Sequence, residues 1–278
     1  MNKIIVTHFN PDMDAITSVW LLKKFDPDFT EAEVIFVPAG QTYKNYKVDE
    51  DENIIHVDTG MGKFDHHQRK EKTCAAKLVF NWLKKKRKDL VCDQPLIQLI
   101  EVVRQIDHFN EVLWPEPSAN QYNFLLHELL DGLKNSGQVN DDGLIDFGLK
   151  GLEGIYSSLK IKDKAAKDLE KGYQFKTSWG RAIGCLSRNN EILKLGQKQG
   201  YILVVQKDSQ TEHVRIKARP DSQVDLTKAQ VELKKLDPQA TWFLHISKKM
   251  LLNGSTKNPK MKPSTLSLTK VIEILEKL

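Results

Sequence analysis

Short apolar runs alternate with longer amphipathic stretches along the first part of the chain. Three runs, at residues 3–7, 34–37 and 54–57, have the length and composition of buried strands. Helical spacing of apolar residues covers about 15–25, 73–88, 94–107, 122–134 and 143–175. Strands that alternate with helices predict a parallel sheet, and ligands of such sheets lie beyond the carboxyl ends of the strands.

The pattern changes near residue 178, where short strands and polar turns replace the alternation of strands and helices. We expect strands at 182–187, 191–195, 201–206, 213–219 and 241–246. Helices are expected at about 226–236 and in the last residues, where Ser264 or Ser267 would be the N-cap. The predicted fold class is α/β, with an N-terminal parallel-sheet domain over 1–177 and a smaller C-terminal α+β domain over 178–278.

Charge is distributed unequally between these two parts. Residues 178–278 contain 18 Lys and Arg against 9 Asp and Glu, a balance of +9. Residues 1–177 contain 24 against 28, a balance of −4. An acidic part can hold cations and a basic part can hold an anion, although solvated lysines are the common cause of a positive surface.

Several protein classes are not indicated by the sequence. No apolar run approaches the roughly 20 residues of a membrane helix, and the N-terminal residues carry no secretory signal. Cys74, Cys92 and Cys185 form neither a disulfide framework nor a zinc-binding pattern. We therefore expect a protein of the reducing cytoplasm.

Three candidate metal ligands follow the first predicted strand. His8, Asp12 and Asp14 belong to the run HFNPDMD, in which a tight loop can turn them toward one point. One imidazole nitrogen and two carboxylates suit Mn²⁺, Co²⁺ or Mg²⁺. The motif alone leaves an alternative open, because Asp14 could simply cap the following helix.

Two further motifs follow the third predicted strand. Asp58 comes directly after that strand, where its carboxylate can bridge two metal ions or merely form a turn. In the run Asp65-His66-His67, a carboxylate can orient a ligating imidazole. We interpret His66 as a metal ligand and His67 as a group directed at the substrate, and a neutral histidine pair on the surface is the alternative.

The last candidate ligand, Asp107, closes the helix predicted at 94–107. A carboxylate in the last turn of a helix interacts unfavourably with the helix dipole. A cation nearby would offset that cost.

In their order along the chain these residues resemble the DHH phosphoesterase superfamily, over roughly residues 3–110. Its members include family II inorganic pyrophosphatases, RecJ-type exonucleases and oligoribonucleases. The short gap between Asp58 and the run DHHQ looks more like the MYG1 branch than the pyrophosphatases. The resemblance implies two Mn²⁺ ions, with Mg²⁺ or Co²⁺ as alternatives, and an activated hydroxide that attacks phosphorus.

The resemblance also implies a role for each residue. Six residues would hold the two ions: His8 and Asp12 one ion, Asp14, His66 and Asp107 the other, with Asp58 as the bridge. Asp65 would orient His66, and His67 would contact the scissile phosphate or assist the leaving group.

The basic second part is expected to contact a phosphate. The run from His213 to Arg219 alternates with period two, so its basic side chains would share one face of a strand. Arginine suits bidentate phosphate contact, and a solvent-exposed strand face is the alternative. The predicted substrate contacts are Arg215, Arg219, Lys249 and Asn253.

One feature departs from the exonuclease branch, whose C-terminal domain carries a G-G-G-H signature. The nearest counterpart here is the run at 251–257, LLNGSTK. This departure affects the identity of the substrate and not the metal chemistry.

Together the motifs predict a divalent-metal-dependent phosphoester hydrolase, a phosphodiesterase or exonuclease on short oligonucleotides or nucleotide phosphates. A pyrophosphatase-like hydrolase of small phosphates and a non-catalytic nucleotide-binding module are the alternatives. The expected partner is a phosphate-containing small molecule or a short single-stranded nucleic acid, without a membrane and with a homodimer as a candidate assembly.

Overall fold

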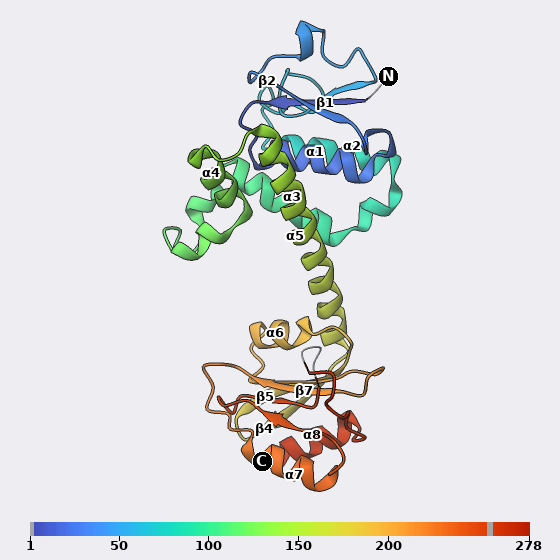
Figure 1. The fold of residues 1–278 in the computed structure, drawn as a ribbon, viewed down its shortest axis with the longest axis vertical. Helices are drawn as coiled ribbons and strands as arrows, with labels where there is room; N and C mark the ends of the chain where they lie inside the picture. Colours follow the sequence, from blue (N-terminus) through green and yellow to red (C-terminus); the bar gives the residue numbers. More distant parts are fainter. Residues whose placement is uncertain (1–2, 255–257) are drawn as a thin grey trace. The chain divides into compact units, whose positions relative to one another are not determined.

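The computed structural model describes residues 3–254 and 258–278 (Figure 1). The chain forms two compact units, Met1–Leu159 and Lys160–Leu278. The first has a parallel sheet flanked by helices and the second has a mixed sheet with helices, which confirms the predicted fold class.

The sheet of the first unit is parallel and three-stranded. Its strand order is β2-β1-β3, with β1 (Ile4–His8) between β2 (Glu33–Val37) and β3 (Ile54–His56). All three strands run in one direction, so their carboxyl ends meet at a single edge.

The helices of this unit share one hydrophobic core with the sheet. They are α1 (Met13–Phe25), α2 (Ala75–Lys86), α3 (Gln94–Asp107), α4 (Leu126–Ser136) and the long α5 (Asp141–Glu170). Short 3₁₀ turns are η1 (Pro27–Phe29), η2 (Tyr43–Asn45), η3 (Lys88–Cys92), η4 (Asn110–Leu113) and η5 (Asn120–Phe124). Figure 1 shows α1 and α2 on the same face of the sheet, where Ile16 and Leu83 are fully buried in one core.

Helix α5 takes part in the cores of both units. Leu144 and Leu152 pack into the core of the first unit, whereas Ala165 and Leu169 pack against Ile183 in the second. The compact units therefore divide inside this helix and not at the boundary of 177 and 178 expected from the sequence.

The second unit is built on a six-stranded mixed sheet of order β4-β5-β6-β7-β9-β8. The strands are β4 (Tyr173–Thr177), β5 (Gly180–Leu186), β6 (Leu203–Lys207), β7 (Val214–Ala218), β8 (Phe243–Leu244) and β9 (Met250–Leu252). The helices are α6 (Glu191–Lys198), α7 (Thr227–Leu236) and α8 (Leu268–Glu276).

Alternate residues of the central strands serve two separate cores, one on each face of this sheet. Ala182 and Leu203 pack with residues of α7 and α8, while their neighbours Ile183 and Val204 pack with residues of α6. Figure 1 shows α6 on one side of the sheet and α7 and α8 on the other.

Three sequence-based assignments in this region were wrong. The strand expected at 191–195 is the start of α6, because Ile192, Leu193 and Gly196 form a buried helical face. The end of the helix expected at 143–175 is instead the start of β4, and β9 was not expected. Within the described residues, no helix has both the length and the apolarity needed to span a membrane.

Candidate metal centre

The predicted ligands gather at the carboxyl edge of the parallel sheet. His8 is the last residue of β1, and Asp58 lies two residues beyond the end of β3, which pairs with β1. Asp12 is the N-cap of α1, the helix that follows β1. The sheet thus positions the first ligand motif and Asp58 at one place.

Asp12 and Asp14 each fix the start of a different helix. Asp12 Oδ1 accepts hydrogen bonds from the amides of Asp14 and Ala15, both at 3.0 Å. The Asp14 carboxylate accepts from the amides of Ala75 and Ala76 at 2.6 and 2.8 Å, at the beginning of α2. The alternative that Asp14 caps its own helix is wrong, because Asp12 does so.

The Asp58 carboxylate lies between two imidazoles. Its Oδ2 is 3.3 Å from His8 Nε2, and its Oδ1 is 3.3 Å from His66 Nε2. The residue has a φ of 55°, a left-handed conformation that costs free energy for a non-glycine residue. Its amide donates to the Phe64 carbonyl at 3.0 Å, which helps to hold this conformation.

His66 faces three carboxylates. Besides Asp58, its Nε2 lies 3.7 Å from Asp14 Oδ2 and 3.6 Å from Asp107 Oδ1. Ligand atoms come within 4.8 Å of one another in three sets: His8, Asp12 and Asp58; Asp14, His66 and Asp107; and Asp58, His66 and His67. The structure thus brings all six predicted ligands together, in the two groups that the resemblance implies.

Two buried carboxylate oxygens of this cluster face histidine rings but accept no hydrogen bond from the described residues. Among the described residues, no hydrogen bond reaches Asp58 Oδ1 or Asp107 Oδ2, although His66 and His108 lie close to them. Unpaired buried carboxylate oxygens are costly unless a cation compensates them. Nitrogen and oxygen donors in this proportion suit Mn²⁺ or Mg²⁺, so the residues present fit a pair of divalent cations.

Burial and neighbouring charges shift the pKa values of these acids. Burial raises the pKa of Asp107 to about 6, and burial together with neighbouring carboxylates raises the pKa of Asp14 well above its usual value. Burial alone would raise the pKa of Asp58, but contacts with His66 and His8 lower it to about 2. Burial alone would lower the pKa of His8, but the Asp58 contact raises it to about 9. The raised pKa of His8 reflects the carboxylates around it, and a cation bound there would take the place of the imidazole proton.

Asp65 contacts His67 and not His66. Asp65 Oδ1 accepts from the His67 amide at 3.0 Å and lies 2.8 Å from His67 Nδ1, while Oδ2 accepts from the Met61 amide at 2.8 Å. The role expected for Asp65 is corrected accordingly: it orients His67. The His67 side chain is 58% exposed and lines a cavity of about 390 Å³ together with His8, Asp12, Asp58 and Asp107.

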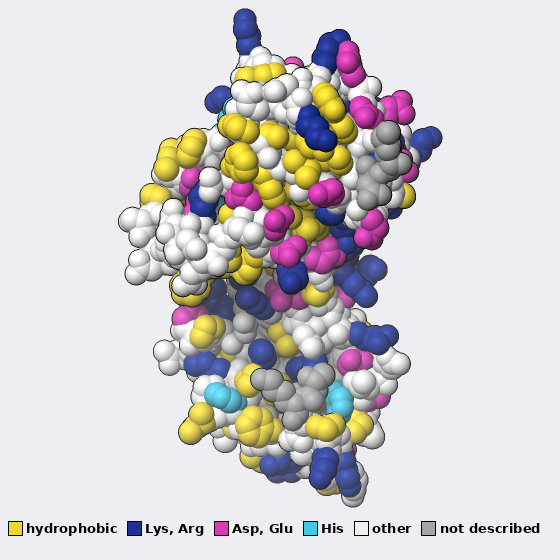
Figure 2. Space-filling model, turned by 45° about the horizontal axis from the view of Figure 1, so that its top comes forward, with side chains coloured by type: hydrophobic (Ala, Val, Ile, Leu, Met, Phe, Trp, Pro, Cys, Tyr) yellow, Lys and Arg dark blue, Asp and Glu magenta, His cyan; other side chains and the backbone are white. Residues whose placement is uncertain are grey.

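In the second unit Arg215 lines a cavity of about 1050 Å³. Its Nε donates to the Gly254 carbonyl at 3.1 Å, and its guanidinium contacts the Asn190 side chain. Four more basic residues line the same cavity, beside the acidic Glu191 and Asp208: Lys160, Lys164, Arg188 and His213. Of these, only His213 was singled out in the sequence, since the others come from a helix and a loop far from the alternating run. Basic side chains are spread over this unit on the face drawn in Figure 2.

The other three predicted substrate contacts lie elsewhere. Arg219 forms a two-pronged pair with Asp221 at 3.0 and 2.6 Å, and Lys249 donates to the Ser222 carbonyl. Asn253 is fully buried, and its amide donates to the carbonyls of residues 241 and 262, so its predicted substrate contact is corrected to a structural role. Residues 255–257 of the run LLNGSTK lie outside the described residues.

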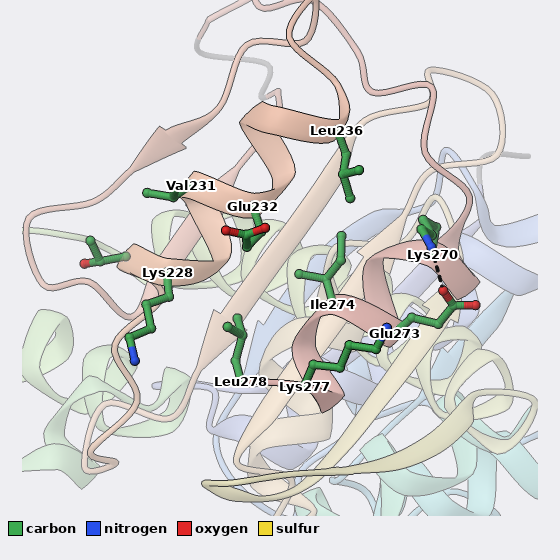
Figure 3. Close-up of a pocket in the computed structure, with 10 residues that line it drawn as sticks. Lys228, Val231, Glu232, Leu236, Lys270, Glu273, Ile274, Lys277 and Leu278 are labelled. Atoms are coloured by element: carbon green, nitrogen blue, oxygen red, sulfur yellow. Dashed lines mark hydrogen bonds and ion pairs between the residues drawn. The ribbon is translucent and has the colours of Figure 1, made fainter.

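A third cavity, of about 510 Å³, lies between α7 and α8 (Figure 3). Val231, Leu236 and Ile274 provide its apolar walls, and Lys270 pairs with Glu273 at its edge at 2.9 Å. None of the predicted site residues lines it.

No protein-family model matches the chain, and no curated protein sequence matches it. Among solved structures, a DHH-domain protein described as a member of the s1p family of ribosomal proteins has a TM-score of 0.32 and 13% identity, over 99% of this chain and 86% of that chain. An uncharacterized protein from Helicobacter pylori G27 has a TM-score of 0.26 and 13% identity, over 100% of this chain and 98% of that chain.

RecJ from Thermus thermophilus, in complex with Mg²⁺, has a TM-score of 0.33 and 12% identity, over 99% of this chain and 49% of that chain. The chain thus spans about half the length of that RecJ. A DHH-domain protein and RecJ are therefore among the solved structures similar to this chain.

Proposed function

We propose that this protein is a divalent-metal-dependent phosphoester hydrolase of the DHH phosphoesterase superfamily. One observation carries the proposal: two sets of ligands, one with His8 and Asp12 and one with Asp14 and His66, meet at the Asp58 carboxylate. A carboxylate with an imidazole on each of its oxygens is placed to bridge two cations. The motif resemblance over residues 3–110 supports the same assignment.

When bound, two divalent cations lower the pKa of a water molecule and neutralise charge on a phosphoryl group. The protein supplies six ligands, which are His8, Asp12, Asp14, Asp58, His66 and Asp107. Asp12 and Asp14 are held by the amides of α1 and α2, so their carboxylates are fixed before any ligand arrives.

His67 has a separate role in this proposal. The Asp65 carboxylate keeps the proton of His67 on Nδ1, which leaves Nε2 to exchange a proton with the leaving group. The exposed ring of His67 lines the same cavity as the ligands. Asp65 is therefore a positioning residue that acts through His67.

The substrate that we propose is a short oligonucleotide or a nucleotide phosphate, and the proposed cations are Mn²⁺. The basic cavity around Arg215 supports a ligand with phosphate groups. A small inorganic phosphate such as pyrophosphate is the second candidate, because the same charges would bind it.

A panel of substrates in the presence of Mn²⁺ tests the proposal. We expect hydrolysis of a short oligoribonucleotide, 3′-phosphoadenosine 5′-phosphate or bis-p-nitrophenyl phosphate, and its loss when the cations are removed with a chelator. Hydrolysis of pyrophosphate alone would favour the second candidate. No hydrolysis with Mn²⁺, Mg²⁺ or Co²⁺ would contradict the proposal and favour a nucleotide-binding module.

A further inference from the structure

A smaller cavity, not described above, borders the metal centre within the first unit, and the proposed mechanism does not use it. It has a volume of about 180 Å³ and shares Asp12, Asp14 and Asp107 with the centre. Its other polar or aromatic walls come from the segment after α3 and from α4: Phe109, Glu111, His127, Glu128 and Asp131. The cavity therefore lies directly beside the metal centre.

Phe109 presents an uncovered aromatic ring at this cavity. The residue is 74% exposed, although burial of a phenylalanine ring is strongly favourable. Its backbone is fixed by a hydrogen bond from its amide to the Ile106 carbonyl at 2.9 Å. An aromatic ring held two residues after a metal ligand is suited to stack on a planar group of the substrate.

His127 contributes a second ring to the cavity. Its imidazole side chain is 11% exposed and packs edge-on against Trp114, with ring centroids 6.4 Å apart. Trp114 in turn packs against Tyr122 at 5.4 Å. The His127 ring is thus held in place by Trp114, which Tyr122 supports in turn.

The remaining walls carry hydrogen-bond acceptors. Glu111 Oε2 is buried and has no hydrogen-bond partner among the residues that the structure describes. Asp131 is paired with Lys134 at 3.2 Å, whereas Glu111 has no ion pair among those described residues. Carboxylates repel a phosphate but accept hydrogen bonds from N–H groups, so the cavity suits the uncharged part of a nucleotide.

Among the nucleobases, guanine fits these acceptors best. Its Watson–Crick edge has two adjacent donors, N1–H and the N2 amino group, which a single carboxylate can accept together. Uracil has one donor between two acceptor oxygens, which a carboxylate would repel. We propose that this cavity binds a guanine base of the substrate, stacked on Phe109 and hydrogen-bonded to Glu111.

This inference rests on the proposed function, and the test separates the two. The value of kcat/KM with Mn²⁺ is measured for three 5′-phosphorylated dinucleotides with the same backbone: guanylyl, uridylyl and an abasic form without bases. Cleavage of the phosphodiester in any of them supports the hydrolase. The ratio of kcat/KM for the guanylyl substrate to kcat/KM for the abasic substrate, called the guanylyl-to-abasic ratio, reports on the cavity. If none is cleaved, the proposed function and the inference both fail.

Three variants locate the effect. Phe109→Asn tolerates the left-handed backbone but removes the ring, and should lower the guanylyl-to-abasic ratio by roughly 5- to 100-fold. Phe109→Trp keeps an aromatic ring and should retain most of the ratio. Phe124→Leu removes an aromatic ring that is 81% exposed and does not line the cavity, so it is the matched control.

Glu111→Gln tests the preference among bases. It replaces one acceptor oxygen by a donor and should reduce the guanylyl-to-uridylyl ratio toward one. An unchanged guanylyl-to-abasic ratio in Phe109→Asn would overturn the inference, as would equal kcat/KM of the wild type for the guanylyl and abasic substrates. The hydrolase itself would stand in both cases.

Discussion

Asp58 Oδ1 and His66 Nε2 lie 3.3 Å apart without a hydrogen bond between them. The two groups are at ion-pair distance, but the geometry does not make a hydrogen bond, so a buried carboxylate oxygen accepts none from the described residues. The Asp14 and Asp107 carboxylates face the same imidazole nitrogen at 3.7 and 3.6 Å. This arrangement is more readily explained by a cation among these atoms than by packing alone.

Asp58→Asn should lower kcat for the dinucleotide substrate by at least about 100-fold, because the amide cannot supply two anionic oxygens to bridge cations. The assay is hydrolysis at saturating Mn²⁺. The control is Asp28→Asn, which changes an exposed acid of the same unit. Activity in Asp58→Asn close to that of the control would rule out Asp58 as the bridge.

Arg215→Ala should raise KM for the dinucleotide about 10-fold or more, because a charged hydrogen bond to phosphate contributes about 1.5–3 kcal/mol. Arg219→Ala is the matched control from the same strand region, since its guanidinium is already paired with Asp221 away from the cavity. We expect it to change KM by less than about twofold. Equal effects of the two substitutions would contradict the assignment of the basic cavity.

Gly148→Ala and Gly154→Ala should change stability in opposite directions. A Cβ at Gly148 would lie 2.5 Å from Ile16 Cγ2, so α1 and α5 would have to move apart, at a cost of about 1–3 kcal/mol. A Cβ at Gly154, in the same helix, would meet nothing within 4 Å, and alanine should stabilise by about 0.5–1 kcal/mol. Urea unfolding measures both changes, and a stabilised Gly148→Ala would disprove the packing of α5 against α1.

Asp237 makes the stability of the second unit depend on pH. It is 4% exposed and accepts hydrogen bonds from Ser264 Oγ and the Thr265 amide, both at 2.7 Å. Burial alone would raise the pKa of Asp237, but these hydrogen bonds lower it. Because the folded pKa lies below the unfolded one, its stabilisation is fully present above about pH 4 and is lost as pH falls through the folded value.

Asp237→Asn should therefore reduce the free energy of unfolding at pH 7 by about 1–3 kcal/mol. The difference between the wild type and the variant should shrink below about pH 4. Urea titrations at pH 7 and near pH 3 provide the comparison. A difference that is the same at both pH values would show that the charge of Asp237 is unimportant.

Most ligands of the metal centre could be predicted from local sequence motifs. His8, Asp12 and Asp58 follow predicted strands, and parallel strands bring such residues to one edge without further information. The partner of Asp65 could not be predicted in this way, since the choice between His66 and His67 depends on side-chain rotamers. The link from Asp14 to the start of α2 also needs the tertiary structure, because Ala75 lies 61 positions after Asp14 in the chain.

The second unit was harder to predict because its signals are short. The run at 191–195 fits both the alternation of a strand and the buried face of a helix. In the structure it is a helix, whose buried face packs against β6. Arg215 and Arg219 look equivalent in the sequence, but only Arg215 lines the basic cavity. Asp221, two residues after Arg219, was the available sign that a nearby acid would pair with that arginine.

The number of Mn²⁺ ions bound per chain tests the central claim most directly. Isothermal titration of the metal-free protein with Mn²⁺ should give two ions per chain, and the Asp58→Asn variant should lose at least one of them. A wild-type stoichiometry of zero, or binding of two ions that Asp58→Asn leaves unchanged, would contradict a two-metal centre bridged by Asp58.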